Sequence, residues 1–220
     1  MLTHYGVTPD NFRAVFLTHM STDTPGKFMV VPDFFPQAEN LRLAIDQHFS
    51  TPHEHRPETH QIWNYWYVSE TYTYFRTMPN KIFSYEMLYA FMMHLESWSR
   101  SNLNCVPTYP YLSLYVDGCK QEIHNDALAG SYGYVYSLTR WQARSFTGGE
   151  TLLMKGDAYD RSMAGTEAMA GWSFFEMVPA EFNQLLVFDD RIPHAVRRVE
   201  GGMNPLEGRL VMHGHLSPAE

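Results

Sequence analysis

The sequence has few cysteines, no long apolar run and an excess of acidic over basic residues. Cys105 and Cys119 are its two cysteines, and one such pair does not make the disulfide framework of a small secreted domain. No apolar run approaches the roughly 20 residues that a membrane-spanning helix needs. Residues 1–6 lack the basic and apolar regions of a secretory signal peptide. We therefore expect a reduced, cytoplasmic protein with no membrane partner.

The charge balance argues against nucleic acid as a partner. The 24 acidic residues outnumber the 16 basic ones, which gives a formal net charge of −8 at pH 7. Proteins that bind DNA or RNA need a basic stripe to displace counterions from the phosphates. The densest basic run in this chain is Arg197 with Arg198. We therefore expect no nucleic-acid partner.

Length and composition fit a single domain. The chain has 220 residues, of which 45% are hydrophobic and 18% charged, and β-barrels often reach this length as one domain. The sequence shows no internal repeat and no low-complexity tract. We expect one domain over residues 1–220. A helical and aromatic support region would occupy residues 1–105, and a β core would occupy residues 106–220.

Two histidines and a carboxylate are the most informative residues of the chain. One residue separates His124 from Asp126, and His194 follows later. Residues i and i+2 of a strand point to the same face, so an extended backbone would place His124 beside Asp126 while Asn125 points away. Two histidines and one carboxylate can hold one face of a metal and leave the other open. That ligand set is diagnostic of non-haem Fe(II) oxygenases.

Predicted strands surround these residues. Apolar runs and alternating patterns indicate strands at residues 111–116, 185–188, 194–199 and 209–213. Turn signals separate them, including Asp117 with Gly118 and a second turn directly before His194. A histidine that opens a strand can meet the H-x-D pair from elsewhere when a sheet rolls up on itself.

Arg209 opens the last of these predicted strands. A guanidinium is a rigid fork that grips a carboxylate with two parallel hydrogen bonds. Arg209 could therefore anchor the distal carboxylate of a dicarboxylic co-substrate. A surface salt bridge, the usual role of an arginine, is the alternative interpretation.

In this order the motifs resemble those of the Fe(II)/2-oxoglutarate-dependent dioxygenases, particularly the prolyl-hydroxylase-like branch. The resemblance covers residues 111–215. It rests on the order and spacing of five motifs, which together are much more specific than any one of them. The motifs are Tyr115 in a strand, the pair His124 and Asp126, Gly-Gly-Glu-Thr at residues 148–151, His194 and Arg209.

The resemblance implies a mainly β fold with flanking helices, the double-stranded β-helix or jelly roll. It implies His124, Asp126 and His194 as iron ligands. It further implies Arg209 as the clamp for 2-oxoglutarate and Tyr115 as a hydrogen-bond partner of that co-substrate. The implied activity is a hydroxylase that uses Fe(II), 2-oxoglutarate and O2. Its substrate would be an amino acid, a peptide or protein side chain, or a small natural product.

One departure from the family pattern and two rival functions stay open. Many relatives carry Ser or Thr two residues after the arginine, whereas this chain has Val211, so the clamp would take its hydroxyl from Tyr115 or elsewhere. One rival is a non-catalytic jelly-roll module that binds a metal or ligand. The other is a non-haem iron oxygenase without 2-oxoglutarate, in which Arg209 would have no clamp role.

The first hundred residues predict elements that support the core. Residues 28–31 predict a strand, Pro36 suits the start of a helix, and Ser84 is a natural N-cap for a second helix. That second helix carries one apolar stripe, which comprises Met87, Leu88, Phe91, Met92, Leu95 and Trp98. Alternating aromatic residues at 63–67 and 72–76 predict two strands. Their rings would form a hydrophobic sheet face, which we favour, or a wall above the iron.

Weaker signals come from the remaining histidines and from one long segment. The first group comprises His48, His53, His55 and His60. No carboxylate or cysteine completes a metal site there, so we expect these side chains to face solvent in a loop. His213 and His215 form an equally weak pair. Residues 155–175 show no period, and a loop of that length is usually functional or disordered. We predict a lid over the iron, with a surface insertion as the alternative.

Overall fold

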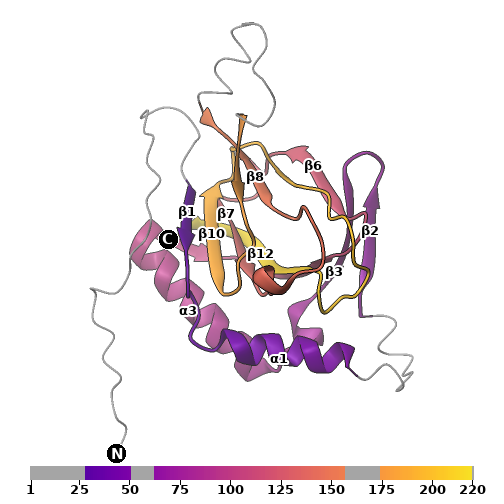
Figure 1. The fold of residues 1–220 in the computed structure, drawn as a ribbon. Helices are drawn as coiled ribbons and strands as arrows, with labels where there is room; N and C mark the ends of the chain where they lie inside the picture. The colour runs from indigo at the N-terminus through magenta and orange to yellow at the C-terminus, as the bar shows by residue number, and fades with distance from the viewer. Residues whose placement is uncertain (1–27, 51–61, 157–173, 220) are drawn as a thin grey trace, which may run out of the picture.

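The computed structural model shows a rolled β-sheet with two helices packed along its outer side (Figure 1). It describes residues 28–50, 62–156 and 174–219. The helices are α1 (Ala38–Phe49) and α3 (Tyr85–Leu103), and two 3-10 turns are η2 (Pro79–Lys81) and η3 (Trp141–Ala143). The strands are β1 (Phe28–Val31), β2 (Asn64–Val68), β3 (Tyr72–Thr77), β4 (Cys105–Pro107), β5 (Tyr111–Tyr115), β6 (Lys120–His124), β7 (Tyr132–Ser137), β8 (Thr151–Met154), β9 (Phe175–Val178), β10 (Gln184–Asp189), β11 (His194–Val196) and β12 (Arg209–Pro218).

The sheet turns around β3. On one side of this strand the order is β3, β5, β12, β7, β10 and β1, and on the other side it is β6, β11, β8 and β9. In β3, residues 75–77 pair with β5, whereas Tyr72 and Thr73 pair with β6. The two halves of the sheet therefore face each other, as Figure 1 shows. β2 pairs with the free edge of β3, and β4 pairs with the end of β12.

The four strands predicted around the site are confirmed, although their ends differ. β10 covers the predicted residues 185–188, β5 ends at Tyr115 rather than at the predicted residue 116, and β12 continues past residue 213 to Pro218. β11 ends at Val196, before the predicted end at residue 199. Its register against β6 shifts between His194 and Val196. This irregularity ends the regular strand early.

Gly148 explains how the chain continues after β11. Its φ of +78° lies in the left-handed region, and a Cβ built on it would lie 1.8 Å from the carbonyl oxygen of Arg198. Only glycine permits this close approach of two backbones. The neighbouring Gly149 N–H donates to the Arg197 carbonyl at 3.0 Å. The Gly-Gly turn thus holds the end of β11 next to the start of β8.

The second predicted helix is confirmed as α3. The Ser84 hydroxyl accepts a hydrogen bond from the Met87 N–H at 3.3 Å, as expected of an N-cap. Leu88, Phe91 and Leu95 from the predicted stripe are buried. The first predicted helix, α1, begins at Ala38, after Pro36 rather than at it.

A buried arginine attaches α1 to the β-sheet. Arg42 is 1% exposed and donates to the Asp46 carboxylate at 2.9 Å within its own helix. Its two terminal nitrogens donate to the carbonyl oxygens of Leu138 at 2.9 Å and Leu206 at 2.5 Å. Burying a cation is costly unless its donors are satisfied. These contacts therefore fix the helix against two loops of the β region.

The aromatic hairpin β2–β3 is confirmed as a pair of strands, but the favoured interpretation of its rings is wrong for β2. All five residues of β2 are exposed, because this strand pairs only with β3 and no layer of the described residues covers it. On β3, by contrast, Tyr74 is buried at 3% exposure. The hairpin is thus anchored through β3 and open along β2.

His48 does not lie in a loop, which corrects the expectation for the first histidine group. It occupies the last turn of α1, and its Nε2 accepts a hydrogen bond from Trp63 Nε1 at 3.1 Å. The partner could not be foreseen because Trp63 approaches only when the chain returns to the sheet. His53, His55 and His60 lie outside the described residues. So do residues 157–173, which make up most of the predicted lid.

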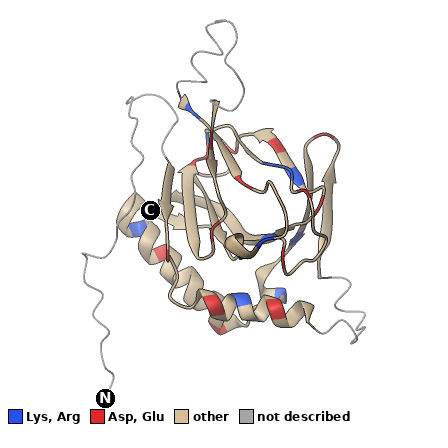
Figure 2. Ribbon diagram, viewed as in Figure 1, with Lys and Arg blue, Asp and Glu red and all other residues tan. Residues whose placement is uncertain are grey.

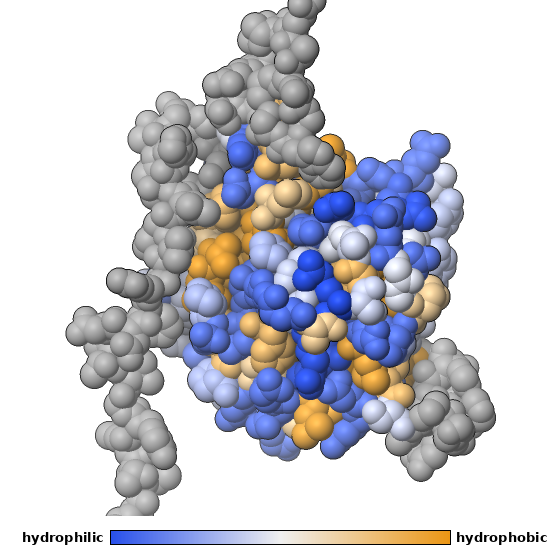
Figure 3. All heavy atoms as spheres, viewed as in Figure 1, coloured by the Kyte–Doolittle hydropathy of each residue, from blue (hydrophilic) through white to orange (hydrophobic). Residues whose placement is uncertain are grey.

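The described surface mixes charge and polarity. Acidic and basic residues are interspersed along α1 and α3 (Figure 2). Apolar and polar side chains are likewise interspersed on the face seen in Figure 3. None of the described helices combines the length and the apolar character needed to cross a membrane.

Candidate metal centre

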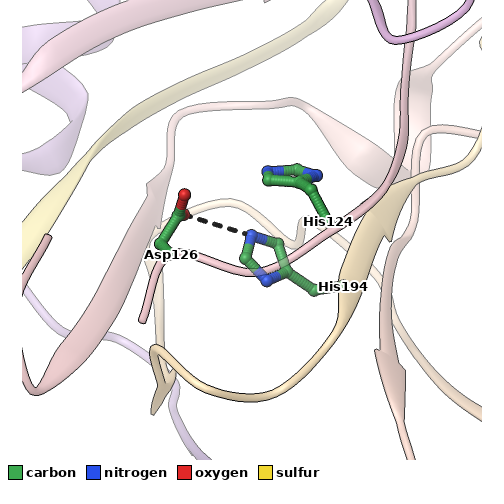
Figure 4. A group of neighbouring side chains, drawn as sticks. All are labelled: His124, Asp126 and His194. Atoms are coloured by element: carbon green, nitrogen blue, oxygen red, sulfur yellow. Dashed lines mark ion pairs between the residues drawn. The ribbon is translucent and has the colours of Figure 1, made fainter. Parts of the chain in front are cut away.

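The structure brings His124, Asp126 and His194 together. His124 ends β6, His194 opens β11, and the two residues are direct partners in the antiparallel pairing of these strands. Their ring centroids lie 4.3 Å apart, and His194 Nε2 lies 3.4 Å from Asp126 Oδ2. One ligand atom of each residue falls within 4.8 Å of the others. The three side chains point toward one another in Figure 4, as a common metal ion requires.

Asp126 lies beyond the end of β6, and a backbone hydrogen bond to the residue after β10 holds it in place. β6 ends at His124, and the Asp126 N–H donates to the carbonyl oxygen of Asp190, just past β10, at 2.9 Å. The intervening Asn125 is exposed, as the spacing predicts. The shared face of the H-x-D pair is thus maintained although the second residue lies beyond the strand.

Backbone carbonyls orient both imidazole rings. His124 Nδ1 lies 2.7 Å from the Glu122 carbonyl oxygen, and His194 Nδ1 lies 2.9 Å from that of Ile192. A carbonyl only accepts, so in each ring Nδ1 carries the proton and donates. The lone pair is then on Nε2, which is the atom left for a metal. Such support of a ligating histidine through its other nitrogen is general in metal sites.

The charge states suit a divalent metal. Burial, followed by the charge of His194, lowers the pKa of His124 and keeps its ring neutral. Burial alone would raise the pKa of Asp126, but its contact with the His194 ring, with His124 and His215 adding to the effect, holds that pKa below its ordinary value. A neutral imidazole and an ionised carboxylate are the forms that bind metal. The donor set and its protonation therefore fit an Fe(II) ion.

A cavity of about 270 Å³ opens beside these ligands. Its lining includes the three candidate ligands and, from the facing half of the sheet, Tyr115 and Arg209. The structure thus places the predicted ligands and the predicted clamp around one space. A small dicarboxylate and a metal can be accommodated together in a cavity of this size.

Arg209 is buried inside the barrel with two donors unused. It is 1% exposed, which rules out the surface salt bridge. Its Nη2 donates to Thr151 Oγ1 at 3.1 Å, whereas Nε and Nη1 have no hydrogen-bond partner among the described residues. Burial lowers the pKa of Arg209, although Tyr115 and Glu150 oppose the change. Buried donors are normally paired, so these two indicate that an anionic group belongs beside Arg209.

Tyr115 lies directly against the guanidinium. The Arg209 side chain sits 4.6 Å from the centroid of the Tyr115 ring, and that ring stacks on Tyr74 at 5.1 Å. Burial raises the pKa of the Tyr115 phenol well above its ordinary value, so it keeps its proton and can donate. Thr151 provides the hydroxyl that Val211 lacks. The sequence contained Thr151 within its Gly-Gly-Glu-Thr motif but did not indicate this role.

Sequence reasoning missed a second polar cluster behind Asp126. The side chain of Asp190 is 1% exposed and accepts a hydrogen bond from His215 Nδ1 at 3.0 Å. Ligand atoms of Asp126, Asp190 and His215 also lie within 4.8 Å of one another. The only signals were the acidic pair before His194 and the weak histidine pair on the last strand. Asp189, the other acidic neighbour, is instead bound to Arg191.

His213 was also missed. It lines the cavity, and its Nε2 lies 2.8 Å from the Ser113 hydroxyl. Part of the ring is open to the cavity, but it lies deep inside the barrel. Burial, reinforced by the charges of Arg209 and Arg76, lowers its pKa to about 3. The cavity wall between the two arginines is therefore neutral at ordinary pH.

Comparison with known proteins places this fold. No family model and no curated protein match the sequence, but solved structures match the fold. A prolyl-4-hydroxylase from Pseudomonas putida is 14% identical over 90% of this chain and 94% of its own, with a TM-score of 0.55. A prolyl hydroxylase from Trichoplax adhaerens, in complex with a hypoxia inducible factor oxygen degradation domain peptide fragment, is 15% identical. It covers 84% of this chain and 81% of its own, with a TM-score of 0.55.

A third structure is HygX from Streptomyces hygroscopicus, solved with nickel, 2-oxoglutarate and hygromycin B. It is 12% identical over 89% of this chain and 84% of its own, with a TM-score of 0.55. At these identities the likeness establishes the fold. The chain is a jelly roll of the kind found in prolyl hydroxylases and other 2-oxoglutarate/iron(II) oxygenases. The predicted fold class, mainly β with flanking helices, is confirmed.

Proposed function

We propose that this chain is an Fe(II)- and 2-oxoglutarate-dependent oxygenase that hydroxylates an unactivated C–H bond. The unpaired donors of Arg209 are the observation that carries the proposal. They lie in the same cavity as a two-histidine, one-carboxylate set. A dicarboxylate that bridges the two would satisfy both ends at once. The jelly-roll fold supports this reading.

The metal would be held by His124, Asp126 and His194. The two histidines are strand partners and Asp126 lies beside them, so the three side chains would occupy one face of the ion and leave the other face to co-substrate and oxygen. Bound Fe(II), with 2-oxoglutarate as the source of electrons, supplies the oxygen-activating chemistry. The protein fixes the ligand geometry and the charge of Asp126.

The co-substrate end of the cavity would be formed by Arg209, Thr151 and Tyr115. The guanidinium offers its unused N–H donors to the distal carboxylate, and the hydrogen bond from Nη2 to Thr151 fixes the plane of the guanidinium. The protonated phenol of Tyr115 can add a third donor. Val196 and Val211, both buried, line the space between the clamp and the metal ligands. Apolar walls exclude water there, which strengthens each charged contact.

Substrates of the similar proteins point to a broad class. The Trichoplax adhaerens structure contains a peptide fragment and HygX contains hygromycin B. We extend to this chain only what these have in common, an organic substrate that enters the cavity beside the co-substrate. An amino acid, a peptide or protein side chain and a small natural product all belong to that class.

Anaerobic titration tests the proposal. Purified chain receives Fe(II) and then 2-oxoglutarate under argon, and absorption spectra are recorded for the metal-to-ligand charge-transfer band of a chelated keto acid. We expect the band in the wild type, its loss in Asp126→Ala and a weaker response in Arg209→Leu. Melting curves of each sample show that the chain is folded.

Admission of oxygen then separates the rival functions. A 2-oxoglutarate oxygenase forms succinate slowly even without substrate. A metal-binding module without activity gives the band but no succinate. An iron oxygenase that does not use 2-oxoglutarate binds iron but gives neither the band nor succinate. Either result contradicts the proposal.

A further inference from the structure

A second arginine lies at the mouth of the same cavity. Arg76 on β3 is held between two aromatic rings, with its guanidinium carbon 3.8 Å from the Trp66 centroid and 4.2 Å from that of Tyr111. Trp66, Tyr109 and Tyr111 all line the cavity and are all exposed. They therefore mark its rim. Arg76 lies in this rim, far less buried than Arg209.

The two rings limit how Arg76 can be used. Both rings lie close to the guanidinium carbon, where cation–π attraction is strong. The N–H donors of a guanidinium lie in its own plane, so a ligand accepts hydrogen bonds from it edge-on. A planar carboxylate fits that approach, because two of its oxygens can accept parallel hydrogen bonds. Stacking also fixes the side chain in advance, so less conformational entropy is lost on binding.

Within the described part of the chain, no carboxylate is paired with Arg76. No ion pair joins it to an acidic residue within residues 28–50, 62–156 and 174–219. Among the described residues, Arg76 has a side-chain hydrogen bond with the neutral phenol of Tyr74. The nearby His213 is neutral, and His215 is bound to Asp190. Arg76 thus has hydrogen-bonding capacity and charge that the described residues do not neutralise.

The charges of the loaded site leave Arg76 unbalanced. In the proposed function, the two positive charges of Fe(II) and the one of Arg209 are balanced by Asp126 and the 2-oxoglutarate dianion. Glu150 near the clamp has its own cation, Arg197, at 3.6 Å, and Asp190 behind Asp126 is paired at 3.0 Å with His215, whose pKa it raises. One positive charge therefore remains at the mouth of an otherwise neutral site. A ligand with a single negative charge would complete the balance.

We propose that Arg76, clasped by Trp66 and Tyr111, binds a carboxylate of the substrate. The enzyme would thereby select organic acids over neutral compounds. This inference rests on the proposed function and names the substrate class of the same site. Arg76 acts in it as a binding residue that orients the substrate.

The position of Arg76 along β3 also sets where the carboxylate lies. Tyr72, Tyr74 and Arg76 alternate along the strand, and the Tyr72 ring contacts that of His124 at 5.3 Å. Four residues of strand span about 13 Å. The carboxylate would therefore bind at the opposite end of this row from the metal ligands. The oxidised carbon is then several bonds away from the acid group.

The test uses matched acid and amide probes. The chain is loaded under argon with Mn(II), in place of Fe(II), and saturating 2-oxoglutarate. The twenty N-acetyl-L-amino acids and their carboxamides are then titrated by calorimetry. We expect at least one acid to bind ten-fold or more tightly than its amide. Arg76→Gln should remove that difference, Arg76→Lys should reduce it, and the exposed helix variant Arg100→Gln should retain it.

A second pair of variants tests the clasp. Trp66→Phe keeps a ring over the guanidinium and should preserve most of the preference for acids, whereas Trp66→Leu should lower it. A panel in which no acid binds better than its amide overturns the proposal. So does a preference for acids that survives in Arg76→Gln.

The co-substrate is measured separately so that the two proposals can fail independently. Arg76→Gln should leave the dissociation constant of 2-oxoglutarate within two-fold of the wild-type value. A larger rise would make Arg76 part of the co-substrate site and would overturn its assignment to substrate. If 2-oxoglutarate does not bind at all, the proposed function fails, and the same titrations on the metal-free chain still decide whether Arg76 selects acids.

Discussion

Arg209 Nη2 donates to Thr151 Oγ1 at 3.1 Å, across the space between the two halves of the sheet. The contact joins the first residue of β12 to the first residue of β8. It fixes the plane of the guanidinium and leaves Nε and Nη1 for a ligand. The clamp is therefore formed before any co-substrate arrives.

Replacement of Arg209 tests the clamp. Each hydrogen bond to a charged group contributes about 1.5–3 kcal/mol. We expect Arg209→Lys to weaken 2-oxoglutarate binding by about ten-fold or more and Arg209→Leu by about a hundred-fold or more, with iron binding intact. Calorimetry with the Mn(II)-loaded chain measures the dissociation constant of 2-oxoglutarate for both variants. Arg100→Leu on the surface of α3 is the control. Wild-type co-substrate affinity in both variants would make Arg209 a structural residue.

The same Arg209→Leu variant should be at least as stable as the wild type without co-substrate. A buried cation with unpaired donors costs free energy, and an apolar side chain in its place is often neutral or stabilising. Added 2-oxoglutarate should then raise the melting temperature of the wild type but not of the variant. A large loss of stability in the variant would show that Arg209 is needed for folding.

Asp126 should be the carboxylate ligand. Asp126→Asn removes the anionic ligand while keeping the shape of the side chain, and we expect iron affinity to fall at least ten-fold, or about 1.4 kcal/mol. Asp189→Asn is the matched control, because Asp189 is bound to Arg191 and lies outside the ligand group. Iron content after dialysis measures both. Full iron content in Asp126→Asn would point to Asp190 as the ligand.

His213 should make the protein sensitive to acid. Its pKa is about 3 in the folded chain, against an ordinary value of 6.5. Above pH 6.5 neither state binds the proton, but as the pH falls toward 3 only the unfolded state does, so stability decreases. At pH 5 this contribution is about 2 kcal/mol. The groups that face the ring are Arg209, Arg76, His215 and Asp126.

Urea unfolding at pH 7.5 and pH 5.0 measures this effect. His213→Gln should lose less stability than the wild type between the two pH values. Ser113→Ala is the control, because it removes the 2.8 Å contact but leaves the imidazole. We expect it to lower stability at both pH values and to keep the wild-type difference. An unchanged pH difference in His213→Gln would contradict the assignment.

Arg42 tests whether the support region and the β core form one domain. Arg42→Ala leaves the Leu138 and Leu206 carbonyls without their donor, and loss of one buried partner costs about 1–3 kcal/mol per group. In a single domain, circular dichroism of the helices and tryptophan fluorescence should show one transition, shifted to a lower temperature. Arg100→Ala provides the control. Two separate transitions in the variant would indicate two domains.

The sequence predicted what depends on local pattern. Alternation and apolar runs located β5 and β10, and Ser84 marked the start of α3, because each signal lies within a few residues. The early end of β11 was not predicted. It depends on the register against β6 and on the backbone approach at Gly148, and neither can be read from residues 194–199 alone.

The site divides in the same way. His124, Asp126 and His194 form a motif whose order and spacing are visible in the sequence, so these residues could be predicted as candidate ligands. The pairs Asp190–His215 and Ser113–His213 were missed because their members meet only in the folded sheet. Arg76 was read simply as a strand residue. Its alternation with aromatic residues was visible, but the rings over it come from two other strands, β2 and β5.

The position of β12 has a consequence for how the site forms. This strand lies between β5 and β7 in the middle of the sheet, yet it follows every other described strand in the chain. Ser113 on β5 and His213 on β12 are in contact, yet they are 100 residues apart in the sequence. Contacts at such separation slow folding, because the intervening chain must be ordered first. During synthesis the H-x-D pair therefore leaves the ribosome long before its clamp, and a complete site can capture metal and co-substrate together only after β12 has been made.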